Sequence, residues 1–395
     1  MVVIVRERPA GADDLAEHVA AVPLVDHHVH GAFRADIDRA RFEDSINEAS
    51  PDPIPAWMTQ FDSQLGFAIR AHCAPLLDLE PHVSADDYWR RRAELGEAEV
   101  TRRFLRAAGV TDWLVDTGYQ SGEILTPAEL AVAAGGRAYE VVRVEAIAES
   151  LVESGISASD YPDAFRSRLA EATQAAVGLK SVCAYRCGFD VDWRRPGDYR
   201  VVAAARAWID SGVVRLSDPT VIAFGVHTAL DAGLPVQFHT GLGDRDLDLH
   251  RANPMLLLDL LRGAIELPTP PPIMLLHCYP YHREAGYLAQ AFTNVYCDVG
   301  LALNYVGARA RAVLAESLEL APFAKTLYSS DGWGPAELHY VGAALWRRAI
   351  GAVLGEWVAA GEWSAGDAVR VVDLLAFGNA RRVYRLDQPS RRPRS

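Results

Sequence analysis

Short, strongly apolar runs recur along this chain and alternate with segments of helical periodicity. The runs are rich in Val, Leu and Ile and are apolar almost throughout, a pattern typical of parallel strands that are buried on both faces. They occupy residues 23–30, 111–118, 139–145, 177–185, 234–239, 272–277, 294–300 and 325–331. We therefore predict eight buried strands.

Helical segments separate these strands. Asn253 and Pro254 open one of them, because a capping side chain is followed by a proline at the first helical position. Others with clear periodicity cover residues 164–176, 200–212, 307–320 and 335–354. Strands that alternate with helices in this way predict an α/β fold of the (β/α)8 TIM-barrel type, whose chemistry lies at the carboxyl ends of the strands.

The regular spacing is broken after the first strand, where residues 31–110 form a long insertion. It contains a proline-rich stretch at 50–55 and helical periodicity over 88–109. An insertion at the carboxyl end of a barrel strand can cover the site, so we predict a helical lid. A purely structural appendage is the alternative.

The rest of the chain shows no repeat and no low-complexity linker, so residues 1–395 are predicted to form a single domain. A last helix is expected over 374–386 and a flexible tail over 387–395. The five cysteines form no CxxC motif, as expected for reduced core residues of a cytoplasmic protein.

Charge and hydropathy narrow the possible partners. The net charge of −13 argues against nucleic acid or an anionic membrane as a partner. No apolar run reaches the roughly 20 residues that span a bilayer, and the opening MVVIV is too short for an export signal. We expect a small-molecule substrate, and a homo-oligomer is left open.

Polar residues that bind metals stand where the predicted strands end. His28 and His30 lie two positions apart on the first run, so both project from the same face. His239, His277 and Asp331 each close a later run. Imidazoles and a carboxylate that converge from several strand ends suit a divalent metal such as zinc. Taken singly, His277 has an alternative role as a core histidine and Asp331 as a turn former.

Other polar residues near the same barrel face are candidates for binding substrate. Glu145 closes the third run, and Arg186, Arg245 and Trp333 follow later strands. A buried ion pair for Glu145 and simple solvation for the loop arginines are the alternatives. Lys180 lies on the fourth run, early enough that it could fall short of the metal.

Several motifs together resemble the amidohydrolase superfamily of metal-dependent hydrolases. They are VDHHVHG, FHTG, LLHCYP, SSDG and the ending FGNARRVYRL, and the resemblance runs from about residue 22 to 386. GLKSVCAYR, FHTGLGDRDLDLHRANP and LYSSDG resemble more narrowly the branch of FluG-like and nodulin-like proteins, where such a domain is joined to one like glutamine synthetase. This chain resembles a stand-alone version. The segment GWGPAEL departs from that branch, which puts the substrate in doubt.

The resemblance implies roles for the strand-end residues. His28, His30, His239 and Asp331 would hold a divalent metal, expected to be zinc, and Asp331 would also act as general base. His277 would contact a second metal or orient the water and the oxyanion. In two-metal members a carboxylated lysine bridges the ions, a role that falls to Lys180, so one or two ions are possible.

Three classes of function remain at this point. The favoured one is hydrolysis of the C–N bond of a small polar amide, with a γ-glutamyl compound suggested by the resemblance. The second is a metal-dependent decarboxylase or lactonase on the same barrel. The third is a non-catalytic regulatory barrel, which the intact ligand set argues against.

Overall fold

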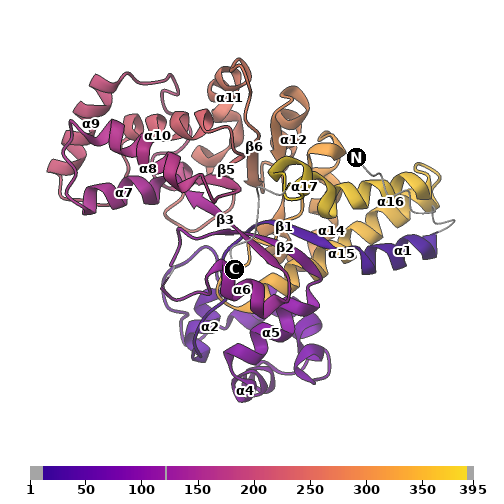
Figure 1. Ribbon diagram of the computed structural model, residues 1–395. Helices are drawn as coiled ribbons and strands as arrows, with labels where there is room; N and C mark the ends of the chain where they lie inside the picture. Colours follow the sequence, from indigo (N-terminus) through magenta and orange to yellow (C-terminus); the bar gives the residue numbers. More distant parts are fainter. Residues whose placement is uncertain (1–11, 121, 389–395) are drawn as a thin grey trace.

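The computed structural model describes residues 12–120 and 122–388, and its centre is one sheet of seven parallel strands in the order β1 to β7 (Figure 1). The opening MVVIV and all of the predicted tail beyond residue 388 lie outside the described residues. The strands are β1 (Leu24–Val29), β2 (Val110–Asp116), β3 (Arg137–Arg143), β4 (Gly178–Ser181), β5 (Val236–Thr240), β6 (Ile273–His277) and β7 (Val295–Cys297). Each lies within one of the predicted runs or within two residues of it, so the apolar pattern predicted them correctly.

The eighth predicted run forms no regular strand. Its segment instead makes backbone hydrogen bonds to both edges of the sheet. The amide of Leu327 donates to the carbonyl of Cys297 on β7 at 3.1 Å, and the amide of His27 on β1 donates to the carbonyl of Tyr328 at 3.2 Å. The segment therefore lies between β7 and β1, and it carries Asp331 to the same edge as the ends of the other strands.

Helices fill the connections between strands. Asn253 caps its helical segment as predicted, because its side chain accepts a hydrogen bond from the Met255 amide at 2.9 Å. None of the described helices is both long enough and apolar enough to cross a membrane. Outside the insertion the helices are α1 (Ala12–Ala21), α6 (Pro127–Ala134), α7 (Val144–Glu153), α8 (Tyr161–Ala172), α9 (Asp198–Asp210), α10 (Pro219–Asp231), α11 (Leu258–Ile265), α12 (His282–Ala291), α13 (Gly300–Val306), α14 (Ala310–Ser317), α15 (Ala336–Ala359), α16 (Ala365–Asp373) and α17 (Asn379–Tyr384).

The insertion between β1 and β2 is helical, and Figure 1 shows its helices grouped on one side of the sheet. The periodicity over 88–109 proves to be two helices, because Gly96 between them adopts a φ of +74° that a continuous helix cannot contain. Apolar residues of the insertion share one core with α13 and α15. The helices are α2 (Arg39–Ser45), α3 (Gln64–Ala68), α4 (Ala85–Leu95) and α5 (Glu97–Ala107).

A buried ion network ties the insertion to the rest of the chain. Arg92 on α4 lies 2.9 Å from Glu97 and 2.7 Å from Glu337 on α15, and all three side chains are almost completely buried. The Tyr88 hydroxyl donates to the same Glu337 carboxylate at 3.0 Å. The larger part of the insertion is thus an integral part of the domain, and only its first part reaches the site.

Candidate metal centre

The carboxyl edge of the sheet brings three of the five sequence-predicted ligands around a fourth, the carboxylate of Asp331. Asp331 Oδ1 lies 3.0 Å from His28 Nε2 and 3.6 Å from His30 Nε2. Its other oxygen, Oδ2, lies 3.5 Å from His277 Nε2. Parallel strands end at one edge, so residues separated by 300 positions in sequence meet here.

Hydrogen bonds leave the ring nitrogens that face Asp331 free to accept a cation. Nδ1 of His28 lies 2.8 Å from Oε1 of Gln237, and Nδ1 of His30 lies 3.1 Å from the backbone carbonyl of Asp116. Both acceptors require a proton on Nδ1, so Nε2 of each ring carries the lone pair. A second hydrogen bond of this kind is the usual way in which proteins orient a metal-binding histidine.

Several polar atoms at the centre have no hydrogen-bond partner among the described residues. Both ring nitrogens of His277 and Oδ1 of Asp331 are buried and have no such partner. Ligand atoms of His28, His277 and Asp331 all lie within 4.8 Å of one another. Since a buried polar atom without a partner costs about 1–3 kcal/mol, this donor set fits a divalent metal ion.

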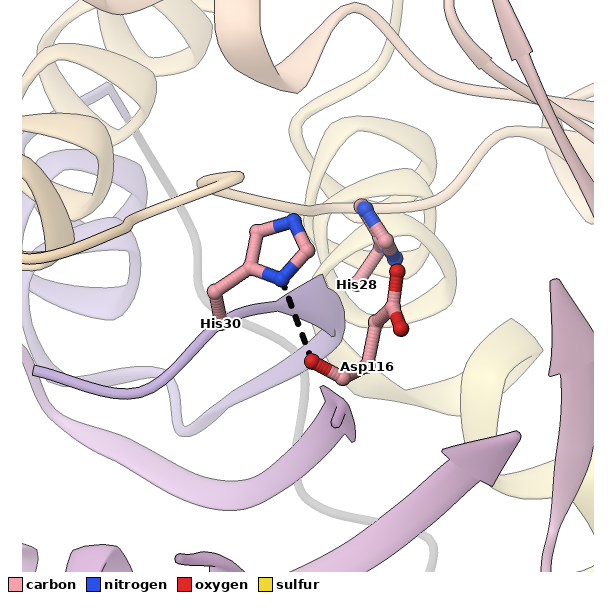
Figure 2. Close-up of side chains that lie close together, drawn as sticks. All are labelled: His28, His30 and Asp116. Atoms are coloured by element: carbon pink, nitrogen blue, oxygen red, sulfur yellow. Dashed lines mark hydrogen bonds between the residues drawn. The ribbon is translucent and has the colours of Figure 1, made fainter. Parts of the chain in front are cut away.

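Asp116 is a further candidate ligand that the sequence reasoning missed. Figure 2 shows it at the end of β2, with its backbone carbonyl bound to His30 and its side chain directed to His28. Ligand atoms of Asp116, His28 and His30 form a second group within 4.8 Å. Asp116 is the last residue of β2, but the predicted run continued to Gly118, so the sequence alone did not mark it as a strand-end ligand. Although burial opposes it, the Arg143 guanidinium at 2.6 Å keeps the pKa of Asp116 below its usual range.

His239 lies next to this centre with its ring turned toward its own loop. Its Nε2 donates to the carbonyl of Leu242 at 2.9 Å. The ring packs against His277 and against Tyr185, with 4.6 Å between ring centroids in both pairs. The structure therefore places His239 beside the centre, but its ligand atoms are in neither of the two close donor groups of the described residues.

Lys180 reaches the centre, contrary to the sequence expectation that it could fall short. Strand β4 ends at Ser181, so Lys180 is its penultimate residue and not an early one. Its Nζ lies 3.2 Å from Nε2 of His28, and the side chain is buried. Burial lowers the pKa of the lysine to about 8.

Burial also sets the protonation of the candidate ligands. It lowers the pKa of His30 to about 4, so this imidazole is neutral at physiological pH. Burial raises the pKa of the Asp331 carboxyl to about 6, against the opposing effects of the neighbouring His30 and Lys180 side chains. The carboxylate can thus gain and lose a proton close to neutrality.

The backbone is strained at two of the ligand positions. His277 has a φ of +67° and Asp331 a φ of +50°, in the left-handed region that costs side chains other than glycine about 1–3 kcal/mol. The His277 amide donates to Asp298 at 3.1 Å, and the Asp331 amide donates to the His28 carbonyl at 3.2 Å. These bonds hold the two side chains in the orientation that the centre needs.

A cavity of about 460 Å³ opens beside these residues, and its wall includes the first part of the insertion. Residues from α2 to Pro51 line one side. Trp333 lines it as the sequence suggested, and its ring contacts those of Phe33 and Tyr119 at 5.3 and 5.5 Å. Within the predicted lid insertion, the residues that line the cavity all lie between Arg41 and Pro51.

The other candidate substrate residues are distributed differently. Arg186 lines the cavity and pairs with Glu149 at 2.7 Å. Arg245 is exposed and pairs with Asp52 of the insertion at 2.5 Å, and it is not among the lining residues. Glu145 belongs to α7 rather than to the end of β3, and its carboxylate accepts from Ser181 at 2.6 Å away from the cavity.

Comparisons with known proteins agree with this site. The amidohydrolase family model matches residues 194–386. Protein fluG of Emericella nidulans is 31% identical over 282 residues, which cover 63% of this chain and 32% of fluG, so the chain spans about a third of that relative. A solved structure of a candidate metal-dependent hydrolase from Lactobacillus casei superposes with a TM-score of 0.84 at 26% identity and covers 94% of this chain and 98% of that one. These matches support the assignment of this chain to the amidohydrolase superfamily.

More distant solved structures share the fold alone with this chain. A uronate isomerase of Thermotoga maritima superposes with a TM-score of 0.62 at 14% identity, over 94% of this chain and 97% of that one. A glucuronate isomerase of Caulobacter crescentus gives the same TM-score at 18% identity and covers 100% of this chain and 99% of that one. The assignment to the superfamily and the histidine–aspartate groups together support a hydrolase that uses a divalent metal.

Proposed function

We propose that this protein is a metal-dependent amidohydrolase that cleaves the C–N bond of a small polar amide. The observation that carries the proposal is the set of buried ligand atoms of His28, His277 and Asp331 next to a cavity of about 460 Å³. We propose His28, His30, His239 and Asp331 as the metal ligands. Zinc is the ion we expect, because imidazole and carboxylate groups are among its usual ligands.

The proposed architecture is a complete (β/α)8 barrel in which residues 325–331 act as the eighth strand. The backbone bonds of this segment to both β7 and β1 support this view. A closed barrel gives the site its position, because the ends of all the strands then surround one axis.

The residues around the cavity have separate tasks in such a reaction. A divalent metal, when bound, lowers the pKa of a water molecule and polarises a carbonyl group. Asp331, with a pKa of about 6, takes the proton from the attacking water and returns it to the leaving amine. His277, whose ring is held firmly by its buried surroundings, orients the oxygen atom on which negative charge develops.

The substrate class follows from the cavity and from the family. A space of this size, with charged and aromatic walls, suits a compound no larger than a dipeptide. The likeness to fluG supports a γ-glutamyl amide as the first compound to test. Arg186 is the proposed contact for its carboxylate, since one edge of the guanidinium pairs with Glu149 and the other is available.

We propose one metal ion per chain rather than two. Lys180 is close enough to the centre to take part, at 3.2 Å from His28, and its amine is proposed to stay unmodified and to act as a neighbouring hydrogen-bond donor. Elemental analysis of the purified protein tests this point. A content near two ions per chain would contradict it and would promote Lys180 to a bridging ligand.

The experiment that tests the function is a screen of amides with the zinc-loaded protein, with the released amine as the readout. Turnover that is lost in His28→Ala, together with its metal, would support the proposal. Carbon dioxide is measured in parallel, because its release without amine would indicate a decarboxylase. Full metal occupancy and activity in His28→Ala would contradict the assigned site.

A further inference from the structure

Two carboxylates of the cavity wall, besides Asp44 and Asp331, form no salt bridge with a lysine or arginine among the described residues. Glu48 follows α2 in the insertion and Asp244 follows β5, and both line the cavity. Glu48 hydrogen-bonds with the hydroxyl of Tyr305, and the Asp244 carboxylate accepts from the Asp246 amide at 2.8 Å. In the part of the chain that the structure describes, neither forms a salt bridge.

The arginines of the same cavity, by contrast, are all matched by acidic neighbours. Arg41 pairs with Glu123, Arg143 with Asp116, Arg186 with Glu149 and Arg215 with Asp246, at N–O distances between 2.6 and 3.4 Å. These carboxylates offset most of the positive potential of the arginines in the cavity. Glu48 and Asp244 are therefore among the acidic groups of the wall that form a salt bridge with none of these arginines.

Aromatic side chains surround these two carboxylates, which are partly shielded from solvent. Burial, followed by the negative charges of Asp331 and Asp244, raises the pKa of Glu48 well above its usual range. Burial and then the charges of Glu48 and Asp244 raise the pKa of the phenols of Tyr119 and Tyr185, which also line the cavity. Carboxylates that line one cavity without a salt bridge are costly, and a cation bound beside them would relieve that cost.

We propose that Glu48 and Asp244 receive an ammonium group of the substrate, so that the preferred substrates are amides that also carry a free amine. The inference rests on the proposed function, because it takes this cavity as the active site. Carboxylates beside tyrosine rings are the surroundings that bind ammonium groups well. A metal ion is a poorer fit, since neither residue is in a close donor group among the described residues. The insertion then contributes to specificity and not only to enclosure.

Direct binding to the zinc-loaded protein tests the proposal without the need for turnover. Calorimetry compares two pairs of compounds that differ in ammonium groups, L-glutamate with glutarate and putrescine with 1,4-butanediol. In at least one of the two pairs, the compound with the amine should bind about tenfold more tightly than its partner. This ratio is expected for a charge-assisted contact worth about 1.4 kcal/mol. Glu48→Gln and Asp244→Asn should each reduce this preference several-fold with unchanged zinc content. Glu80→Gln, which alters an exposed glutamate of the same insertion, should leave it unchanged.

A kinetic comparison separates recognition from chemistry. With L-γ-glutamyl-p-nitroanilide and its analogue without the amine, glutaryl-p-nitroanilide, Glu48→Gln should raise KM for the first compound only. Equal affinities within both pairs, no binding of either amine, or a preference that survives in both variants would overturn the proposal. An equal loss of kcat on both anilides would assign Glu48 to the chemistry and would also overturn it. If no amide is hydrolysed while the preference for amines persists, the proposed function alone fails.

Discussion

Nδ1 of His28 lies 2.8 Å from Oε1 of Gln237, and this contact determines which nitrogen of the histidine faces Asp331. The Gln237 amide cannot be turned around, because its Nε2 donates to the His27 carbonyl at 2.7 Å, an atom that can only accept. The same Nε2 lies 2.9 Å from the Tyr384 hydroxyl, so α17 at the end of the described chain supports the centre. The tautomer of His28 thus depends on residues more than 200 positions away.

Replacement of Gln237 should therefore weaken metal binding although Gln237 is not a ligand. In Gln237→Leu, His28 loses the acceptor for Nδ1 and can adopt the wrong tautomer. We expect an affinity for zinc about 10- to 100-fold lower and a free energy of unfolding about 1–3 kcal/mol lower. Competition with a chromophoric chelator and denaturant unfolding measure the two effects. The control Gln290→Leu changes an exposed glutamine of α12 and should alter neither, whereas unchanged zinc affinity in Gln237→Leu would contradict this role.

The strands were predictable because their burial requires apolar residues at consecutive positions of the sequence. Strands covered on both faces need long apolar runs, so their positions could be read directly from the chain. The break at Gly96 was missed because apolar positions continue with helical spacing on both sides of it. The eighth run was predicted as a strand, yet it pairs with its neighbours through isolated bonds only.

The site was predictable where it follows from strand ends, and less so elsewhere. His28, His30, His277 and Asp331 meet because parallel strands end at one edge. Asp116 obeys the same rule, but the predicted run extended two residues past the true end of β2, so Asp116 did not stand at a predicted strand end. The partners of Arg186 and Arg245 come from distant segments, and Glu48 lies in an irregular part of the insertion. Sequence spacing contains no information about contacts of this kind.

Metal uptake should depend on pH through Asp331. Burial raises the pKa of this carboxyl to about 6 in the metal-free protein, so below this value a proton must leave before a cation can bind. The affinity for zinc should be nearly constant from about pH 7 upward and should fall about tenfold per pH unit below 6. His30, with a pKa of about 4, stays neutral throughout this range and adds no second step. A chelator titration between pH 5 and 8 measures the profile, and an affinity for zinc that stays constant down to pH 5 would contradict the role of Asp331.

The buried network at Arg92 should be important for stability and unimportant for metal binding. Arg92→Met removes the cation between Glu97 and Glu337 and leaves two carboxylates buried without compensation. Loss of one member of a buried ion pair costs about 3–5 kcal/mol, so the midpoint of denaturant unfolding should fall markedly. The control Arg90→Met removes an exposed pair with Asp87 on the same helix and should cost about 1 kcal/mol or less. Equal effects of the two substitutions would show that the network does not anchor the insertion.

Arg245 should control access to the cavity rather than recognise a carboxylate. Its guanidinium lies 2.5 and 3.0 Å from the two Asp52 oxygens, and its amide donates to the Ala49 carbonyl at 3.0 Å, so it fastens the segment that includes Ser50 and Pro51 of the cavity wall. Both charged side chains are more than half exposed, and such a pair contributes at most about 1 kcal/mol and is weakened by salt.

In Arg245→Ala we therefore expect faster hydrogen exchange in residues 46–58, little change in stability, and an effect on substrate binding that is the same for charged and uncharged amides. High salt should make the unaltered protein behave like the variant. Arg194→Ala removes an exposed pair with Asp192 far from the cavity and serves as the control. A rise in KM confined to carboxylated substrates would instead identify Arg245 as their binding residue. Loss of the contact between Arg245 and Asp52 should affect charged and uncharged small substrates alike.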